Sequence, residues 1–253
     1  KIPVIHVEAG LRSFDRSMPE EVNRIITDQL SDLLFVTEKS GIENLFREGI
    51  DSGKIHFVGN VMVDTLKKHR DLAERDSRIL ETLKLESKQY VVLTLHRPSN
   101  VDTIGVLRPI LEVINELSKE LKIVFSVHPR TREKIKEFDL ECITQPFSTI
   151  GPLPYLDMVR LMSHSKLVMT DSGGIQEETT ILGVPCVTIR ENTERPITVE
   201  KGTNLLGGIQ RDSLLMAVKS ILESGEKDKG VPDLWDGKTA ERIVKIILSW
   251  AIS

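Results

Sequence analysis

Residues 171–178, which read DSGGIQEE, combine side chains that suit the binding of a nucleotide phosphate. An apolar run ends just before this segment, and a helical pattern begins within it. Glycines at a strand-to-helix turn let an anion approach the backbone, and the free N–H groups of a helix start favour a phosphate. We therefore predict that Ser172, Gly173 and Gly174 bind a diphosphate. Glu178, about one turn further on, would accept hydrogen bonds from ribose hydroxyls. In the alternative interpretation, Ser172 only caps the helix.

Two further carboxylates follow another apolar run, near the start of the sequence. Glu8 comes after residues 2–7 and before Gly10, so we expect it at the carboxyl end of a strand. Glu20 and Arg24 stand four residues apart on the next expected helix and therefore share one of its faces. Two carboxylates beside one cleft could carry out acid–base chemistry. The alternative for Glu20 and Arg24 is an ion pair on the surface.

Cationic side chains follow two more apolar runs. His96 and Arg97 come directly after VVLTL, and Arg195 lies in the polar segment that follows residues 184–189. In an open parallel sheet, ligands bind beyond the carboxyl ends of the strands, so His96 and Arg97 suit a phosphate or a leaving-group oxygen. Glu194 and Arg195 place charges where an opposite domain could meet a sugar. A structural histidine and a solvated loop are the alternatives.

Short apolar runs alternate with amphipathic segments of helical length, which predicts an α/β fold with parallel sheets. The expected strands are 2–7, 33–37, 55–58, 90–95, 122–127, 142–145, 166–170 and 184–189. The expected helices are 19–31, 40–48, 62–84, 104–120, 131–138, 154–164, 173–182, 212–224 and 238–252. Pro19 suits the first position of a helix, and Ser40 with Glu43 matches a capping box.

A domain boundary is expected near Gly59, because a strand ends there and a long helix begins. On this interpretation residues 1–59 are the remnant of a first domain. Residues 60–236 form a more complete second domain, which binds the nucleotide. The last segment, 237–253, is a helix that returns to pack on the first domain.

The composition is that of an ordinary globular chain, with 253 residues of which 40% are hydrophobic and 28% charged. A net charge of -4 gives no reason to expect a nucleic-acid partner. Cys142 and Cys186 form neither a disulfide framework nor a metal-binding pattern, so we expect a reducing, cytoplasmic environment. No apolar run approaches the roughly 20 residues of a membrane span. Because HExxH and GxSxG motifs are also absent from the sequence, we expect a nucleotide-linked substrate bound without metal or cofactor.

Five motifs taken together resemble one family. HVEAGLRS, MPEEVNR, TLHRPSN, TDSGGIQEE and ENTERPITVEKGTN follow the order and spacing of the non-hydrolysing UDP-N-acetylglucosamine 2-epimerases, over essentially the whole chain. The resemblance implies two Rossmann-like domains that face each other across a deep cleft, the glycosyltransferase-B arrangement. It also implies an isomerase that interconverts UDP-N-acetylglucosamine and UDP-N-acetylmannosamine without metal or nicotinamide. Such enzymes eliminate UDP and add it back through a glycal intermediate.

The resemblance assigns roles to the residues that match the family motifs on the nucleotide side. Ser172 and Gly173 hold the diphosphate, and Glu178 holds the ribose. His96 contacts the phosphates and assists the departure of UDP, while Arg195 reaches the diphosphate and the sugar.

On the sugar side, Glu8 and Glu20 match two glutamates near the hexose, with Arg24 beside them. Either glutamate is a candidate for the base that removes the proton at C2 of the sugar. The resemblance places the uracil near Tyr155, Leu156 and Met158. The family often has an aromatic residue in place of Met158, which puts stacking on the base in question.

The sequence departs from the family by lacking a GTRPE loop and a later GDT segment. Roughly a third of a typical family domain would be missing, so we expect an incomplete first domain, and activity of this chain alone is in question. A glycosyltransferase of the same architecture and a UDP-binding fragment without catalysis are the alternative functions. A homodimer and a product used in surface polysaccharide synthesis are implied by the resemblance only.

Overall fold

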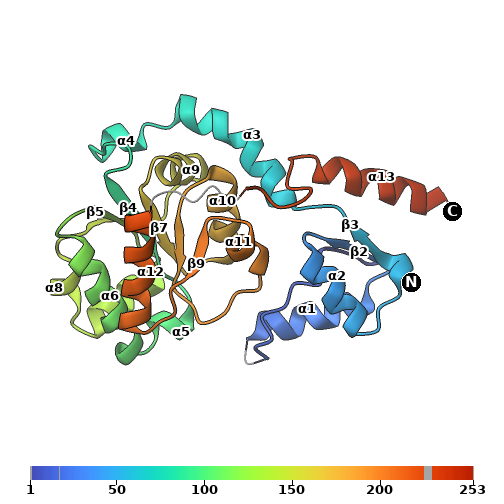
Figure 1. Ribbon diagram of the computed structural model, residues 1–253, viewed down its shortest axis with the longest axis horizontal. Helices are drawn as coiled ribbons and strands as arrows, with labels where there is room; N and C mark the ends of the chain where they lie inside the picture. The colour runs from blue at the N-terminus through green and yellow to red at the C-terminus, as the bar shows by residue number, and fades with distance from the viewer. Residues whose placement is uncertain (1, 17, 225–229, 253) are drawn as a thin grey trace.

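The computed structural model describes residues 2–16, 18–224 and 230–252, which form two parallel sheets placed side by side along the long axis (Figure 1). The first lobe contains a three-stranded sheet of β1 (Ile5–Ala9), β2 (Leu33–Val36) and β3 (Ile55–Phe57), in that order. Its helices are α1 (Pro19–Leu30), α2 (Lys39–Arg47), a 3-10 turn at Ser52–Lys54, and α13 (Thr239–Ile252) from the end of the chain.

The second lobe is built on a six-stranded parallel sheet of order β6-β5-β4-β7-β8-β9. Its strands are β4 (Tyr90–Thr94), β5 (Lys122–Ser126), β6 (Ser148–Ile150), β7 (Leu167–Thr170), β8 (Cys186–Thr188) and β9 (Asn204–Leu206). Read from β4, this is the doubly wound strand order of dinucleotide-binding domains. The chain adds β5 and β6 on one side of β4 and then β7, β8 and β9 on the other side, so the strand order reverses between β4 and β7. The predicted α/β class with parallel sheets is confirmed.

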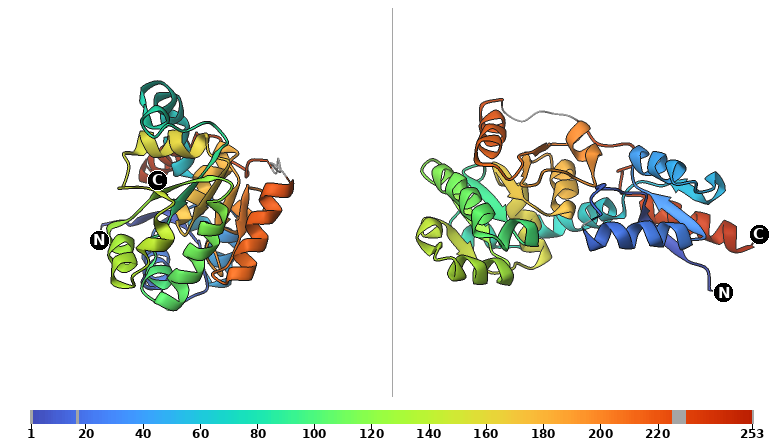
Figure 2. Two further views of the ribbon diagram at one scale, coloured as in Figure 1. Left: turned by 90° about the vertical axis from the view of Figure 1, so that its left-hand side faces the viewer. Right: turned by 90° about the horizontal axis from the view of Figure 1, so that it is seen from below.

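Helices cover both faces of the larger sheet (Figure 2). They are α3 (Val61–Asp76), α4 (Ile79–Thr82), α5 (Pro98–Val101), α6 (Ile104–Leu117), α7 (Pro129–Glu137), α8 (Glu141–Thr144), α9 (Tyr155–Ser163), α10 (Gly173–Leu182), α11 (Pro196–Glu200) and α12 (Arg211–Ser224). Alternate residues of β4 enter different cores: Val91 and Leu93 pack with α6 and α12, whereas Tyr90 and Val92 pack with α9. Because both faces are covered, every residue of β4 is apolar or threonine and buried.

The first lobe obtains part of its core from the far end of the chain. Leu33, Phe35 and Val58 form a buried cluster with Ile243 of α13. The carboxylate of Asp64 on α3 accepts hydrogen bonds from the first backbone amides of α13, which fixes where this helix begins. The chain therefore passes between the lobes twice, once after β3 and once before α13.

These two connections contact each other. A side chain at Gly59, which has φ +91°, would meet the carbonyl oxygen of Leu234 at 2.2 Å, so only glycine fits this crossing. The neighbouring Trp235 is buried and donates from Nε1 to the carbonyl oxygen of Thr37 at 3.0 Å. The joint between the lobes is thus packed from both directions of the chain.

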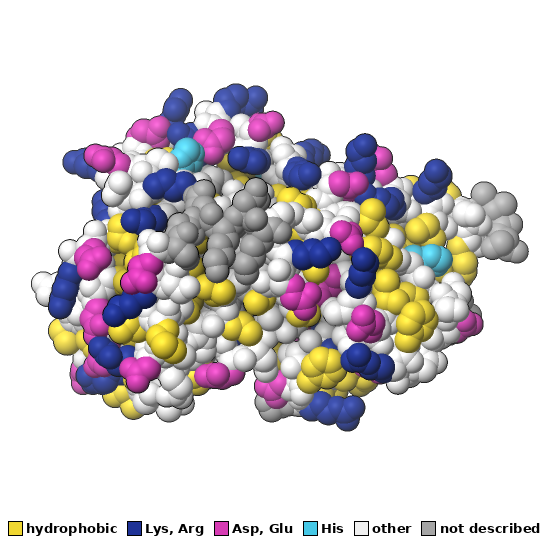
Figure 3. Space-filling model, viewed as in Figure 1, with side chains coloured by type: hydrophobic (Ala, Val, Ile, Leu, Met, Phe, Trp, Pro, Cys, Tyr) yellow, Lys and Arg dark blue, Asp and Glu magenta, His cyan; other side chains and the backbone are white. Residues whose placement is uncertain are grey.

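Apolar side chains remain exposed on the first lobe. Ile26 and Leu30 of α1 are 52% and 64% exposed, and Leu248 of α13 is 60% exposed. Figure 3 shows hydrophobic side chains spread between charged ones over this right-hand lobe. The helices that flank the smaller sheet therefore carry exposed apolar surface.

Three local predictions are wrong. The segment 142–145 lies mostly in helix α8, and the strand comes later, as the half-exposed edge strand β6. The single helix expected over 62–84 is interrupted after Asp76, because Ser77 is extended and bonds to Asp157. The capping box fails because α2 begins earlier, with Glu38 as its cap, so the Ser40 hydroxyl donates to Glu38 instead. Pro19 does stand at the start of α1, as predicted.

Candidate functional site

The carboxyl ends of β4 and β7 are joined by one buried carboxylate, Asp171. It accepts hydrogen bonds from the backbone amides of His96 and Arg97, at 3.0 and 2.8 Å, and its Oδ1 lies 2.8 Å from Nδ1 of His96. Burial acts to raise the pKa of Asp171, but the hydrogen bond and charge of His96 outweigh burial and lower it. Asp171 therefore stays ionised and fixes the orientation of the imidazole.

His96 and Ser172 line one small cavity of about 160 Å³ at this reversal point of the sheet. The ring of His128 also lines it, with its centroid 6.1 Å from that of His96. Ser172 stands at the start of α10 but its side chain forms no capping hydrogen bond. The alternative in which Ser172 serves as a helix cap therefore does not describe the structure, and its side chain faces the cavity instead.

Arg195, in the loop before α11, collects carboxylates from both lobes. Its Nε lies 2.7 Å from Glu177 of α10, and its Nη1 lies 3.0 Å from Glu194. Its Nη2 lies 3.5 Å from Glu8, at the end of β1 in the first lobe. A Cβ atom at Gly173 would come within 3.0 Å of Arg195 Nη1, so the guanidinium lies directly over the start of α10.

Two carboxylates around Arg195 have pKa values shifted far from their ordinary value, in opposite directions. Burial raises the pKa of Glu177 to about 7 in spite of the Arg195 charge. Burial also acts to raise the pKa of Glu194, but the charges of Arg195 and Arg190 overcome it and lower that pKa to about 2. The close approach of Arg195 Nε to Glu177 is not aligned as a hydrogen bond, so neither atom has a hydrogen-bond partner within the described part of the chain. We call Glu8, Glu177, Glu194 and Arg195 the Arg195 cluster.

The backbone at Glu8 has φ +67°, a left-handed conformation that is uncommon for a residue with a side chain. The pairing register between β1 and β2 also shifts between Val7 and Ala9. With this local distortion, the Glu8 side chain extends from β1, the edge strand of the smaller sheet, to Arg195 of the other lobe, where the two form an ion pair. Strained backbone of this kind is concentrated at functional sites.

Arg24 pairs with Glu21 rather than with its predicted neighbour Glu20. The Arg24–Glu21 distance is 2.8 Å, and Glu21 is buried and also accepts from the backbone amides of Ser13 and Phe14. Glu21 therefore shapes the loop that follows Glu8. Glu20 remains exposed on α1 and is not used in this ion pair.

Glu178, on the same helix as Glu177, lies against Tyr155. Burial raises the pKa of Glu178, and a hydrogen bond with the Tyr155 hydroxyl opposes the shift. The other two residues predicted near the base are partly buried: Met158 packs in the core beneath α9, and Leu156 packs against α3. Of the three, Tyr155 is the one in direct contact with a predicted ribose-binding residue.

The structure thus brings His96, Arg97, Ser172 and Gly173 together at the carboxyl ends of β4 and β7 and connects them, through Arg195, with Glu8. Arg97 Nη2 lies 3.3 Å from Glu194, which links it to the same cluster. Sequence reasoning missed Asp171 and Glu177 as members of this site. Asp171 directly follows a strand and so carried a usable signal; the inward orientation of Glu177 carried none, because it depends on the rotation of α10.

Among the described residues, no group of three or more His, Cys, Asp or Glu side chains is arranged to hold a metal ion. Within the same residues, no helix has the length and apolar character needed to cross a membrane.

The chain resembles known proteins over nearly all its length. A family model described as UDP-N-acetylglucosamine 2-epimerase matches residues 1–248. The chain is 43% identical to the UDP-N-acetylglucosamine 2-epimerase of Methanocaldococcus jannaschii, over 98% of this chain and 69% of that protein. It is 40% identical to the UDP-2,3-diacetamido-2,3-dideoxy-D-glucuronate 2-epimerase of Pseudomonas aeruginosa, over 90% of this chain and 63% of that protein. The crystal structure of the Methanocaldococcus enzyme in complex with UDP-GlcNAc and UDP superposes with a TM-score of 0.90, covering 98% of this chain and 69% of that one.

Proposed function

This chain belongs to the UDP-N-acetylglucosamine 2-epimerase family, and we propose that it interconverts UDP-N-acetylglucosamine and UDP-N-acetylmannosamine. The observation that carries this proposal is the position of Arg195. One guanidinium lies over Gly173 at the start of α10 and also reaches Glu8 of the other lobe. A diphosphate beside α10 would therefore lie close to a carboxylate that can act on the attached sugar.

The diphosphate would bind at the reversal point of the sheet. Backbone amides at Gly173 and Gly174, with the Ser172 hydroxyl beside them, suit its oxygens, because the start of a ten-residue helix favours negative charge. Arg97 and Arg195 supply positive charge on the same side. His96, oriented by Asp171, would donate a hydrogen bond to the phosphate oxygen that departs with UDP.

The reaction would proceed by elimination and re-addition. A base removes the proton at C2, the bond between C1 and the UDP oxygen breaks, and a C1–C2 double bond forms. UDP then adds back to C1 while a proton returns to C2 from the opposite face. Glu8 and Glu20 are the proposed acid–base residues, and Arg24 would bind near the sugar. The distorted backbone at Glu8 and its contact with Arg195 support its part in this assignment.

The nucleoside would extend along α10 and α9. Glu178 would accept from the ribose hydroxyls, displacing or sharing its present partner Tyr155. The uracil would lie near Tyr155, Leu156 and Met158. The family relationship further supports a homodimer in the cytoplasm whose product is used for surface polysaccharides. The division of the chain into 1–59, 60–236 and 237–253 is likewise our proposal.

A proton NMR time course of this chain with UDP-N-acetylglucosamine in deuterated water tests the proposal. We expect UDP-N-acetylmannosamine with deuterium at C2, and we expect Glu8→Gln to abolish both the product and the exchange. Glu133→Gln, which alters an exposed glutamate on α7, is the matched control. Turnover only after addition of an acceptor would instead indicate a glycosyltransferase. Broadening of UDP signals without turnover would indicate a fragment that binds but does not catalyse.

A further inference from the structure

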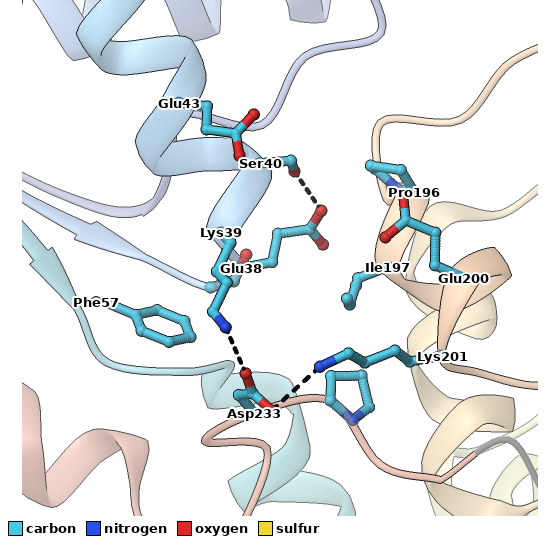
Figure 4. Close-up of a pocket in the computed structure, with 12 residues that line it drawn as sticks. Glu38, Lys39, Ser40, Glu43, Phe57, Pro196, Ile197, Glu200, Lys201 and Asp233 are labelled. Carbon is cyan, nitrogen blue, oxygen red and sulfur yellow. Dashed lines mark hydrogen bonds and ion pairs between the residues drawn. The ribbon is translucent and has the colours of Figure 1, made fainter.

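A second cavity, of about 320 Å³, lies between the lobes and contains residues of both. Figure 4 shows Glu38 and Ser40 of the first lobe facing Pro196 and Ile197 of the second. Pro196 directly follows Arg195. The cavity therefore borders the loop that carries the central arginine of the proposed active site.

Glu38 is the unusual residue in this cavity. Its side chain is 3% exposed, and although the residue stands at the start of α2, the carboxylate does not cap that helix. Oε1 accepts from the Ser40 hydroxyl at 2.5 Å, whereas Oε2 has no hydrogen-bond partner among the described residues. Figure 4 shows the carboxylate extending towards α11. A buried carboxylate with an unsatisfied oxygen destabilises the fold, so a structural role alone does not account for it.

The groups that face Glu38 come from the second lobe. Burial raises its pKa to about 7, while the Arg195 charge and the backbone amide of Ile197 act against that shift and Glu200 adds to it. The two lysines of the cavity are occupied elsewhere: Lys39 and Lys201 both contact Asp233, at 3.0 and 3.2 Å. Because these lysines pair with Asp233, the part of the second lobe that can stabilise the Glu38 carboxylate is the Arg195–Ile197 turn, on the opposite side of the cavity.

We propose that Glu38 is a positioning residue for Arg195, and that its free carboxylate oxygen receives the Arg195–Ile197 turn when the lobes close on a bound nucleotide. The proposal rests on the proposed function, since it concerns the same active site. Closure would reduce the cavity and bring the Ile197 amide to Oε2. Arg195 would then be held from the first lobe by Glu8 on one side and, through the backbone of its own turn, by Glu38 on the other.

The experiment compares Glu38→Ala, Glu38→Gln and a control, Glu43→Gln. Glu43 lines the same cavity, but its side chain is 65% exposed and pairs, among the described residues, with Arg47 of its own helix at 3.5 Å. Binding of UDP is measured by calorimetry, closure by the change in radius of gyration on adding UDP, and turnover by NMR. A thermal melt of each variant verifies folding.

We expect Glu38→Ala to bind UDP within about twofold of wild type, to lose the compaction, and to reduce kcat by about 10²-fold, because a misplaced Arg195 no longer stabilises the departing phosphate. Glu38→Gln, which keeps an acceptor oxygen for the amide but loses the charge, should compact partly and show an intermediate kcat. Glu43→Gln should match wild type in all three measurements.

Equal compaction and equal kcat in wild type and Glu38→Ala would overturn the role of Glu38, as would a wild-type chain that does not compact on adding UDP. Suppose that the wild-type chain compacts with UDP and Glu38→Ala does not, but the wild-type chain forms no epimer. That result would contradict the proposed function alone. If Glu38→Ala does not fold, Glu38→Gln decides the question by the same measurements.

Discussion

Two clusters of buried charge, one within the first lobe and one around Arg195 of the second, differ in how many of their buried polar atoms form hydrogen bonds. In the first lobe, Asp28 accepts from Arg12 at 2.6 Å, from the Gly10 amide at 3.1 Å, and lies 2.5 Å from His6. Arg12 also binds both oxygens of Glu48. We call these residues the Asp28 cluster. Its members all come from one lobe and their hydrogen bonds are aligned.

The Arg195 cluster is as dense but incomplete. Among the described residues, neither oxygen of Glu177 nor Oε2 of Glu194 has an aligned hydrogen bond, although Arg195 lies 2.7 Å from Glu177 and Arg190 lies 2.8 Å from Glu194. The longest ion pair of the cluster, to Glu8, crosses between the lobes. A complete hydrogen-bond network stabilises a fold, whereas an incomplete one lowers its stability but leaves polar groups available to a ligand. Burial and charge alone do not separate the two cases; the completeness of the hydrogen bonds does.

The largest effect should come from breaking the complete cluster. Arg12→Ala leaves the Asp28 carboxylate buried without its guanidinium partner, and removing one partner of a buried ion pair typically destabilises a protein by about 3–5 kcal/mol. Urea unfolding measures this loss. Arg130→Ala, which removes an exposed partner of Asp102, is the control and should leave unfolding nearly unchanged. If Arg12→Ala were equally mild, the Asp28 cluster would not be a structural network.

The two clusters should also respond to pH in opposite directions. Glu177 has a pKa of about 7 in the folded chain against 4.5 as its ordinary value, so the folded state binds more protons between these values. Its contribution to stability is then favourable at low pH and is lost as pH rises from about 4.5 to 7, by at most about 3 kcal/mol. The lowered pKa of Asp28 acts the other way, because its stabilisation is lost only as pH falls below 3.8.

Urea unfolding of wild type and Glu177→Gln at pH 5 and pH 7.5 separates these contributions. The variant should lose less stability than wild type between the two pH values. An identical loss in both proteins would show that Glu177 does not titrate in this range.

Function should be sensitive where stability is not. Glu177→Gln keeps the shape of the side chain but weakens the hold on Arg195, so we expect epimerisation to fall by about 10²-fold while the melting temperature at pH 7.5 stays equal or rises. Glu133→Gln on the surface of α7 is the control. A parallel loss of activity and stability would place Glu177 with the structural carboxylates.

The smallest effect concerns the glycine under Arg195. In Gly173→Ala the added Cβ would lie 2.9 Å from Glu194 Oε1 and 3.0 Å from Arg195 Nη1, so these groups must shift by a few tenths of an ångström. We expect the affinity for UDP to fall about tenfold, or about 1.4 kcal/mol, as measured by calorimetry. Gly105→Ala, at a helix position with open space around it, should bind UDP as wild type does.

The sequence predicted the centre of the larger sheet better than its edges. β4 and β7 are buried throughout and appear as continuous apolar runs, so their positions and the residues that follow them could be found. The edge strands β6 and β9 are partly exposed and carry Ser148, Thr149 and Asn204, so no apolar run marks them. The segment 142–145 was mistaken for a strand because four residues are too few to show a helical period.

The candidate site follows the same division. His96, Ser172 and Arg195 could be expected to lie near one another because parallel strands place the residues that follow them at the same end of the sheet. The ion pair of Arg24 with Glu21 could not be chosen over Glu20, since spacings of three and four residues both place side chains on one helix face. Contacts between the lobes, such as that of Arg195 with Glu8, depend on the packed joint around Trp235 and carry no local signal.

The return of α13 to the first lobe also determines the order in which the molecule can mature during translation. Strands β1 to β3 leave the ribosome before the second lobe, but the cluster around Phe35 lacks Ile243 until α13 has been made. The carbonyl of Thr37 likewise waits for Trp235, 198 residues later. Domains usually fold as they emerge, starting from the N-terminus. Here strands β1 to β3 are synthesised before the second lobe but can complete their core only after it, once α13 has been made.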